Sequence, residues 1–436
     1  MKNLPLYWKI LIGMALGVAF GFIAVNTGLE DFARKWIMPW GTIFLNLLKM
    51  IAVPLIVASL IKGISDLKDI SKLSQIGGRT IGIYILTTLT AVVIGLLLVN
   101  IIQPGNGIEE TTRANLLEGY AADATAKIKT ANETETFKEA PLKFIVDMVP
   151  DNIVGAATSN KNMLQVIFFA IFFGIAMILV PEEKVRSVKS FFDGLNDIVL
   201  KMIDLVILMA PYGVFALLAG LVVNSPSADI FIALGKYAFT LVLGLAIMIA
   251  MYAVLVAVFT GKSPGFFFKG ISPAQLLAFS TSSSAATLPV TMERVEEHLG
   301  VEKEVVSFVL PIGATVNMDG TSVYQAVAAV FIAQVFGFDL SMMDQLTIVF
   351  TATLASIGSA AVPSAGIVML VIVLESIGVP ASGIALIFAV DRPLDMCRTV
   401  VNVTGDATVA MLVAKSVGKL GDPKPKNWDD HYEKVA

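Results

Sequence analysis

Apolar runs long enough to cross a bilayer recur from the N-terminus to about residue 416, and they constrain the fold more than any other feature. A helix that spans a bilayer needs about 20 apolar residues. Of the 436 residues, 56% are hydrophobic and only 15% are charged, which is far more apolar than a soluble domain. Because backbone polar groups find no water in a bilayer, they must be satisfied within the chain. The sequence predicts an all-α integral membrane protein.

Charge and reactive side chains exclude several classes of function. A net charge of −4 gives no sign of nucleic-acid binding. The single cysteine, Cys397, excludes an intrachain disulfide. The two histidines, His298 and His431, both lie in polar stretches, so no histidine-based metal or nucleophile site is expected inside the membrane.

Lysine and arginine in the polar links predict the orientation of the spans. The first span is expected to be retained rather than cleaved as a signal peptide, the fourth to be broken near Pro150, and the fifth to be kinked at Pro211. Both termini are predicted to be cytoplasmic. The expected spans are about 10–26, 38–61, 80–102, 143–180, 193–223, 230–259 and 305–336, followed by an eighth that ends at Lys415.

Two further apolar segments, 274–291 and 347–374, have polar or small-residue centres. In the first, six of the eight residues from Ser280 to Thr287 carry hydroxyl groups, and the second contains ASIGSAAVPSAG. A lipid-facing crossing cannot have such a centre, whereas irregular backbone is tolerated at membrane depth when protein or a cavity covers it. Both segments are therefore predicted to be re-entrant hairpins.

The two hairpins belong to an internal repeat. SSSAATLP at 282–289 aligns with SIGSAAVP at 356–363, and each hairpin leads into a helix with an Asn-x-x-Gly pattern, at 317–321 and 402–406. The predicted topology brings the first hairpin in from the inside and the second from the outside, so the two units are inverted. Inverted repeats with interrupted segments indicate the midplane site of a transporter.

The last span carries five charges between residues 391 and 406. At about 100° per residue, Asp391, Arg398, Thr399, Asn402 and Asp406 all fall within about 60° of Asp395 on one helix face. A charge at the bilayer centre costs at least about 2.5–3.5 kcal/mol. The stripe therefore faces a partner, a ligand or a water-filled cavity. The alternative is an internally paired set, with Asp395 bound to Arg398, that only locks helices together.

At these residues the chain resembles the glutamate transporter family, the dicarboxylate/amino acid:cation symporters. The resemblance covers essentially the whole chain and includes the serine-rich tip, NMDGT at 317–321, and the DxxxDxxRTxxNxxGD stripe. It implies a transporter rather than an enzyme, with eight transmembrane helices plus two re-entrant helical hairpins. It also implies a homotrimer in the plasma (inner) membrane that works by an elevator-type alternating-access mechanism.

The resemblance divides the chain into a scaffold and a moving transport domain. Scaffold residues are 1–79 and 143–224; transport-domain residues are 80–103 and 225–416; 104–142 is an extracellular loop and 417–436 a cytoplasmic tail.

For the substrate, the resemblance implies an acidic amino acid, L-aspartate or L-glutamate. Arg398 would bind the side-chain carboxylate, which a guanidinium matches with two parallel hydrogen bonds, and Asp395 would bind the amino group. The remaining matching positions are Ser284, Thr321, Val362, Gly366, Thr399 and Asn402.

For co-transported Na⁺, the resemblance implies three oxygen-lined positions, which suit a hard cation. The first comprises Asp319 with Tyr84, Thr87, Thr88 and Asn317; the second, Asp406 with backbone oxygens of Gly313, Asn317 and Asn402; the third, backbone oxygens near Thr315, Ser356, Ile357 and Ser359.

The sequence departs from its relatives at several positions. Some relatives carry an arginine where Ser282 stands and others where Met396 stands, and Arg392 is a possible substitute about one turn away. Gln325 replaces a glutamate of proton-coupled animal members, which argues against proton co-transport. A proton-coupled acidic amino acid or C4-dicarboxylate symporter remains the alternative.

Two rival functions have less support. A scaffold protein needs no buried carboxylates, and an intramembrane protease built on Asp319 and Asp406 leaves the oxygen-rich sets and paired hairpins unexplained.

Overall fold

The structure, a computed structural model, describes residues 6–66, 74–108, 146, 149–158, 162–224, 229–357 and 365–425. Regular secondary structure in these residues is helical, apart from an isolated bridge between Val301 and Leu420. Three helical stretches of this part of the chain are long and apolar enough to cross a membrane: Glu30–Lys62, Ile76–Ile102 and Asp229–Thr260. The described residues thus agree with the predicted all-α membrane protein.

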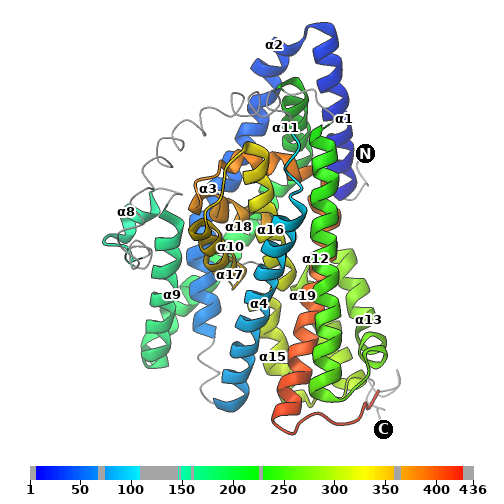
Figure 1. Ribbon diagram of the computed structural model, residues 1–436. Helices are drawn as coiled ribbons and strands as arrows, with labels where there is room; N and C mark the ends of the chain where they lie inside the picture. The colour runs from blue at the N-terminus through cyan, green and yellow to red at the C-terminus, as the bar shows by residue number, and fades with distance from the viewer. Residues whose placement is uncertain are drawn as a thin grey trace, which may run out of the picture.

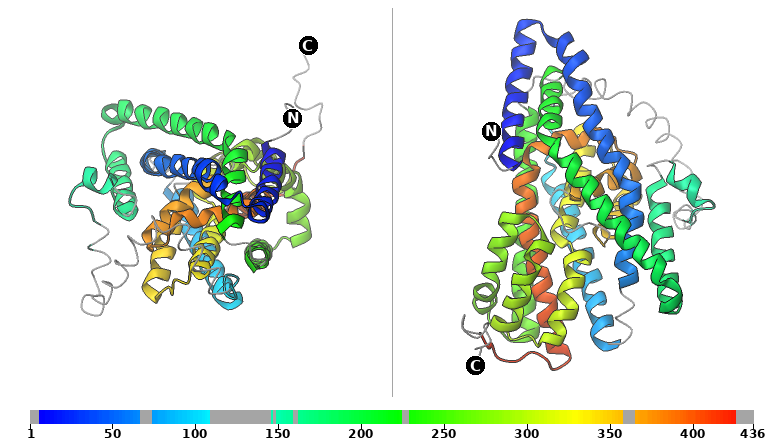
Figure 2. Two further views of the ribbon diagram at one scale, coloured as in Figure 1. Left: turned by 90° about the horizontal axis from the view of Figure 1, so that it is seen from above. Right: turned by 180° about the vertical axis from the view of Figure 1, so that it is seen from behind.

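Helices from the first half of the chain pack around α3 (Met38–Asp66). Helix α11 (Ala210–Asn224) lies against both α3 and α1 (Leu6–Thr27), while α9 (Met163–Leu179) and α10 (Glu182–Leu208) lie against α3. Seen from above in Figure 2, α10 runs along one side of the molecule with α3 beside it. The short elements of this half are α2 (Glu30–Phe32), η1 (Ala33–Ile37) and α8 (Ile153–Ala157).

The fifth predicted span, 193–223, differs from the structure in its start and at its proline. Helix α10 begins at Glu182, and the next helix begins at Ala210, with only Met209 between them. The polar stretch 181–190 resembles a link by composition, but Glu182 and Glu183 lie in the first turn, where carboxylates stabilise a helix N-terminus. Pro211 starts a new helix instead of kinking an old one, because proline is tolerated in a first turn.

Helices from the second half of the chain, together with α4 (Ser74–Ile102), pack around α19 (Ile384–Ser416). In Figure 1, α19 runs in red between α12 and α15. The other elements are α12 (Asp229–Thr260), α13 (Pro264–Thr281), α14 (Ser284–Glu293), η5 (Arg294–His298), α15 (Lys303–Val316), α16 (Asp319–Phe336), α17 (Met342–Ile357), α18 (Ala365–Ser376) and η6 (Ala381–Gly383).

Helix interruptions occur where the sequence predicted them. Helices α13 and α14 are separated by Ser282, which adopts a left-handed φ of 52°, and by Ser283, whose side chain caps α14 through the N–H of Ala286. Asn317 and Met318 separate α15 from α16 in non-helical conformations. The second tip, residues 358–364, lies outside the described residues. Helix ends therefore occur within the group of elements that surrounds α19.

Glycines allow α1 and α11 to approach each other closely. A Cβ on Gly13 would collide with the carbonyl oxygen of Pro211, and one on Gly17 with that of Phe215. Small residues four apart let helix backbones meet in a bilayer, where dispersion contacts drive association.

Gly17→Leu is expected to destabilise the protein, because the added side chain has no space against α11. Overpacking of this kind costs about 1–3 kcal/mol, so the apparent melting temperature in detergent should fall by several degrees. Gly235→Leu in α12 is the matched control, since a Cβ there meets no atom within 4 Å. An equal effect of the two substitutions would contradict the close α1–α11 contact.

Candidate functional site

The polar stripe on α19 is buried along its length. Arg398 is fully buried, and Asp391, Asp395, Thr399, Asn402 and Asp406 are also buried. The one-face pattern of the sequence thus corresponds to a continuous polar surface inside the protein. Lipid cannot satisfy these groups, so neighbouring helices or a ligand must do so.

Arg398 forms two ion pairs through one nitrogen. Its Nη2 donates to Asp391 Oδ1 at 3.0 Å and to Asp395 Oδ1 at 2.9 Å. The guanidinium carbon also lies 3.7 Å from the centre of the Tyr324 ring, a cation–π contact. Two carboxylates therefore bind Nη2, and an aromatic ring packs against the plane of the guanidinium.

The other two nitrogens of this guanidinium have no hydrogen-bond partner among the described residues. These nitrogens, Nε and Nη1 of Arg398, are both buried. A Cβ on Gly366 would lie 3.3 Å from Nη1 and 3.3 Å from the methyl carbon of Thr321, so Gly366 lies between Nη1 and Thr321. A buried unsatisfied donor costs about 1–3 kcal/mol, more on a charged group. An anionic acceptor at this position would recover that cost.

Asn402 connects the stripe to the interrupted helix. Its Oδ1 accepts from the backbone N–H of Gly320 at 2.8 Å, and its Nδ2 faces Thr321 Oγ1 at 3.5 Å. Thr399 donates to the carbonyl of Asp395 within α19. Ser284 is buried at the start of α14, which packs against α19, and Val362 lies outside the described residues.

Asp319, at the start of α16, lies in a pocket of hydroxyl groups. Thr88 donates to its Oδ1 at 2.8 Å, and Tyr252 donates to its Oδ2 at 2.5 Å. Thr87 donates to the side-chain oxygen of Asn317 at 3.3 Å. The side chain of Asp319 is fully buried, and these two hydroxyl partners come from α4 and α12.

Asp406 is joined to the same pocket through the helix break. Asn317 Nδ2 donates to Asp406 Oδ1 at 3.0 Å. A Cβ on Gly313 would collide with both the Tyr84 hydroxyl and the Asp406 carboxylate, so these two groups meet at that glycine. Tyr84 itself donates to the carbonyl of Val309. The structure thus brings the first two predicted cation sets into one connected cluster.

The third predicted cation set is only partly assembled. Ser356 is buried and donates to the carbonyl of Met318 at 3.2 Å, which places the end of α17 against the helix break. Ile357 is the last residue of α17. Thr315 is exposed and its hydroxyl returns to the carbonyl of Ile312, while Ser359 lies outside the described residues.

The two ends of the site differ in electrostatics. Asp391 and Asp395 pair with guanidinium groups. Within the described residues, Asp319 and Asp406 are instead hydrogen-bonded by neutral hydroxyl and amide groups. A buried carboxylate without a countercharge is costly unless it is protonated or binds a cation. Carboxylate, hydroxyl and carbonyl oxygens are the ligands that a hard cation prefers.

Tyr252 belongs to the polar cluster around Asp319, but the sequence did not predict it. Its hydroxyl contacts Asp319, and a Cβ on Gly405 would lie 2.7 Å from it, so it touches both α16 and α19. In the sequence it is one aromatic residue in an apolar span. The only available signal was a hydroxyl group where lipid or core packing requires none.

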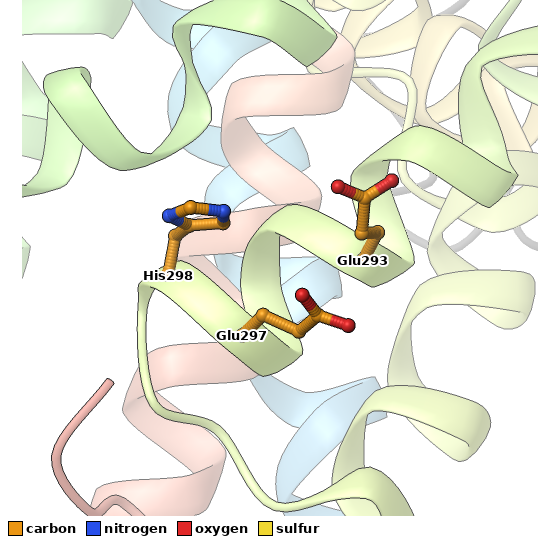
Figure 3. A group of neighbouring side chains, drawn as sticks. All are labelled: Glu293, Glu297 and His298. Carbon is orange, nitrogen blue, oxygen red and sulfur yellow. The ribbon is translucent and has the colours of Figure 1, made fainter. Parts of the chain in front are cut away.

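A separate group of metal-ligating side chains lies near the end of the first hairpin. Figure 3 shows Glu293, Glu297 and His298, each with a possible ligand atom within 4.8 Å of the others. Burial, and next the charge of Arg294, lower the pKa of His298 from its ordinary value. This group lies in the polar link before α15 and shares no residue with the predicted site.

Comparison with known proteins places the chain among membrane transporters, not enzymes. The sequence model of the Sodium:dicarboxylate symporter family matches residues 6–416, and the chain belongs to this family. This confirms the resemblance inferred from the sequence motifs.

Named relatives of the family match nearly the whole chain. The proton/sodium-glutamate symport protein of Bacillus caldotenax is 35% identical over 98% of this chain and 98% of its own length. The proton/glutamate-aspartate symporter of Escherichia coli (strain K12) is 34% identical over 95% of this chain and 94% of its own. Excitatory amino acid transporter 1 of Ambystoma tigrinum is 36% identical over 92% of this chain and 81% of its own.

Tyr252→Phe is expected to destabilise the folded protein by about 1.5–3 kcal/mol, the usual worth of a hydrogen bond to a charged group. Tyr237→Phe is the matched control, because the Tyr237 hydroxyl is buried without a hydrogen-bond partner among the described residues. Thermal unfolding of the two variants in sodium-free buffer measures the difference. Equal stability would show that the contact with Asp319 contributes nothing.

Proposed function

We propose that this protein is a secondary active transporter that carries an acidic amino acid, L-aspartate or L-glutamate, into the cell together with sodium ions. The observation that carries the proposal is that two buried nitrogens of Arg398, Nε and Nη1, have no hydrogen-bond partner among the described residues. Both are donors on a cation, so an anionic acceptor such as a carboxylate would satisfy them. The printed names of the relatives, which refer to glutamate and aspartate, support the same substrate class.

Asp395 distinguishes an amino acid from a plain dicarboxylate. It is an anionic acceptor next to the guanidinium, with Oδ1 bound to Arg398 and Oδ2 facing Arg392 at 3.4 Å. An ammonium group donates to such a carboxylate, whereas a C4-dicarboxylate has no ammonium to offer. The pairing of Arg398 and Asp395 therefore favours an acidic amino acid over a C4-dicarboxylate. Thr321, Gly366, Thr399 and Asn402 complete this proposed pocket, with Ser284 and Val362 from the hairpin tips.

Arg398→Ala should abolish high-affinity binding of aspartate and glutamate. Loss of the paired, charge-assisted contact is worth about 1.5–3 kcal/mol or more, which is at least tenfold in affinity. Binding is measured by calorimetry on purified protein, and uptake with radiolabelled aspartate in proteoliposomes. Arg34→Ala, which removes an exposed guanidinium on η1, is the control. Unchanged aspartate affinity in Arg398→Ala would rule out this assignment.

Charge balance supports sodium coupling. The charges of Arg392 and Arg398 are balanced by those of Asp391 and Asp395. An acidic amino acid therefore adds a net charge of about −1, which a negative-inside membrane opposes by about 2.3 kcal/mol per 100 mV. One sodium ion cancels this charge, and two or more make inward transport electrically favourable. Asp319 and Asp406 are the anionic anchors proposed for these ions, with the hydroxyl, amide and carbonyl oxygens described above.

Proton coupling is the second candidate, because a proton also neutralises a buried carboxylate. Relatives are named both proton/sodium and proton symporters. Two features favour sodium here. The cluster around Asp319 and Asp406 offers oxygens from four different elements, and Gln325 at 0% exposure is an amide that cannot carry a proton.

Substrate binding should tighten steeply with sodium concentration, and sodium should bind more tightly when substrate is present, because linkage is reciprocal. Asp406→Asn should flatten this sodium dependence without removing the substrate site. Asp339→Asn, at an exposed position between α16 and α17, serves as the control. Uptake that ignores sodium but follows an imposed pH gradient would replace the sodium proposal with the proton one.

The proposed mechanism is an elevator in a homotrimer in the plasma (inner) membrane, with both termini cytoplasmic. Residues 80–103 and 225–416 would form the moving unit, including both hairpins and the last two spans, and residues 1–79 and 143–224 the scaffold. Packing supports this division: α4, α12–α16 and α18 contact α19, whereas α9, α10 and α11 contact α3 and α1 packs against α11.

A further inference from the structure

Arg392 lies next to the proposed substrate pocket, and the function proposed above uses only its charge. It is on the same helix as Arg398, one turn before Asp395, and its Nη1 lies 3.4 Å from Asp395 Oδ2. The sequence left its partner undetermined. The structure identifies Asp395, the residue proposed to bind the substrate's ammonium group.

The two arginines hold Asp395 with different strength. Arg398 Nη2 contacts Oδ1 at 2.9 Å with its side chain 1% exposed, whereas Arg392 contacts Oδ2 at 3.4 Å with its side chain 18% exposed. Charge-assisted hydrogen bonds are normally about 2.7–2.9 Å, so the Arg392 contact is the weaker one. Arg392 is already partly exposed while it is paired, and a charge that is less deeply buried depends less on its partner for compensation.

We propose that Arg392 is a placeholder for the ammonium group of the substrate: it occupies Asp395 Oδ2 when no substrate is bound and is displaced when an acidic amino acid arrives. The inference rests on the proposed function, because it requires Asp395 to bind an ammonium group. Arg392 acts through Asp395 and is thus a positioning residue. It keeps the buried carboxylate compensated between transport cycles and weakens substrate binding by competing for the same oxygen.

Competition makes a prediction specific to substrates that carry an ammonium group. Arg392→Gln should tighten aspartate binding by about two- to fivefold, the range expected for the loss of one partly exposed ion pair. Succinate, which has both carboxylates but no ammonium, should bind no more tightly than before. Because release becomes slower, aspartate uptake should show a lower KM together with a lower maximal rate.

The experiment measures aspartate and succinate binding to the purified full chain in sodium, followed by uptake into proteoliposomes. Arg392→Lys keeps a cation that can reach Asp395 and should restore wild-type behaviour, and Arg34→Gln, on an exposed part of η1, controls for the loss of a guanidinium. A general change in the fold would alter the binding of aspartate and succinate alike. If Arg392 acted only by attracting negative ligands at long range, its loss would weaken the binding of both, and of the doubly charged succinate more.

Weaker or unchanged aspartate binding in Arg392→Gln would overturn the placeholder role. If this variant fails to fold, Arg392→Met, which keeps the apolar stem of the side chain, carries the same test, and failure of both would show that Arg392 has a structural role instead. The proposed function fails separately, when the wild-type chain itself binds no acidic amino acid. The two outcomes are therefore distinguishable.

Discussion

A guanidinium buried inside a membrane transporter determines how the second half of the chain must be arranged. Arg398 is fully buried and shares one nitrogen between Asp391 and Asp395. Isolated from partners, such a charge would cost several kcal/mol even after relaxation. Lipid offers no compensation, so the helix that carries it must lie at the centre of its group, covered by α12, α13, α15 and α16. Polar side chains of α19 therefore lie in the interior of this group of helices, whereas in soluble proteins polar side chains mostly face outward.

The interrupted helices follow from the same constraint. Backbone N–H and C=O groups freed at a helix break cannot face lipid, but they can serve a polar centre. Asn402 accepts from the N–H of Gly320 at the start of α16, and Asn317 in the break donates to Asp406. Hydrogen bonds at the helix break therefore connect α16 and the residues before it to α19 at two points, Asn402 and Asp406. The polar groups near Arg398 and those near Tyr252 thus lie against the same interrupted helix.

Periodicity and charge cost predicted much of this arrangement. The shared face of Asp395, Arg398 and Asn402 follows from 3.6 residues per turn, and the break at Asn317 from a polar, glycine-containing stretch in an apolar span. Contacts between distant helices could not be predicted in the same way. Tyr252 has no local signal, since aromatic residues are ordinary packing in a span, and the link before residue 193 became helix because its first-turn carboxylates favour one.

The donors of Arg398 that lack a partner among the described residues bear on whether the stripe locks helices together or binds a ligand. A set of charges that only holds helices together gains stability when every donor is paired, and each buried donor left open costs about 1–3 kcal/mol. Asp391 and Asp395 both use Nη2, whereas Nε and Nη1 are buried without a hydrogen-bond partner among the described residues. Gly366 lies beside Nη1, where an added Cβ would come within 3.3 Å of this nitrogen. A carboxylate at these donors would recover the lost stability, which supports the proposed binding role over a purely structural one.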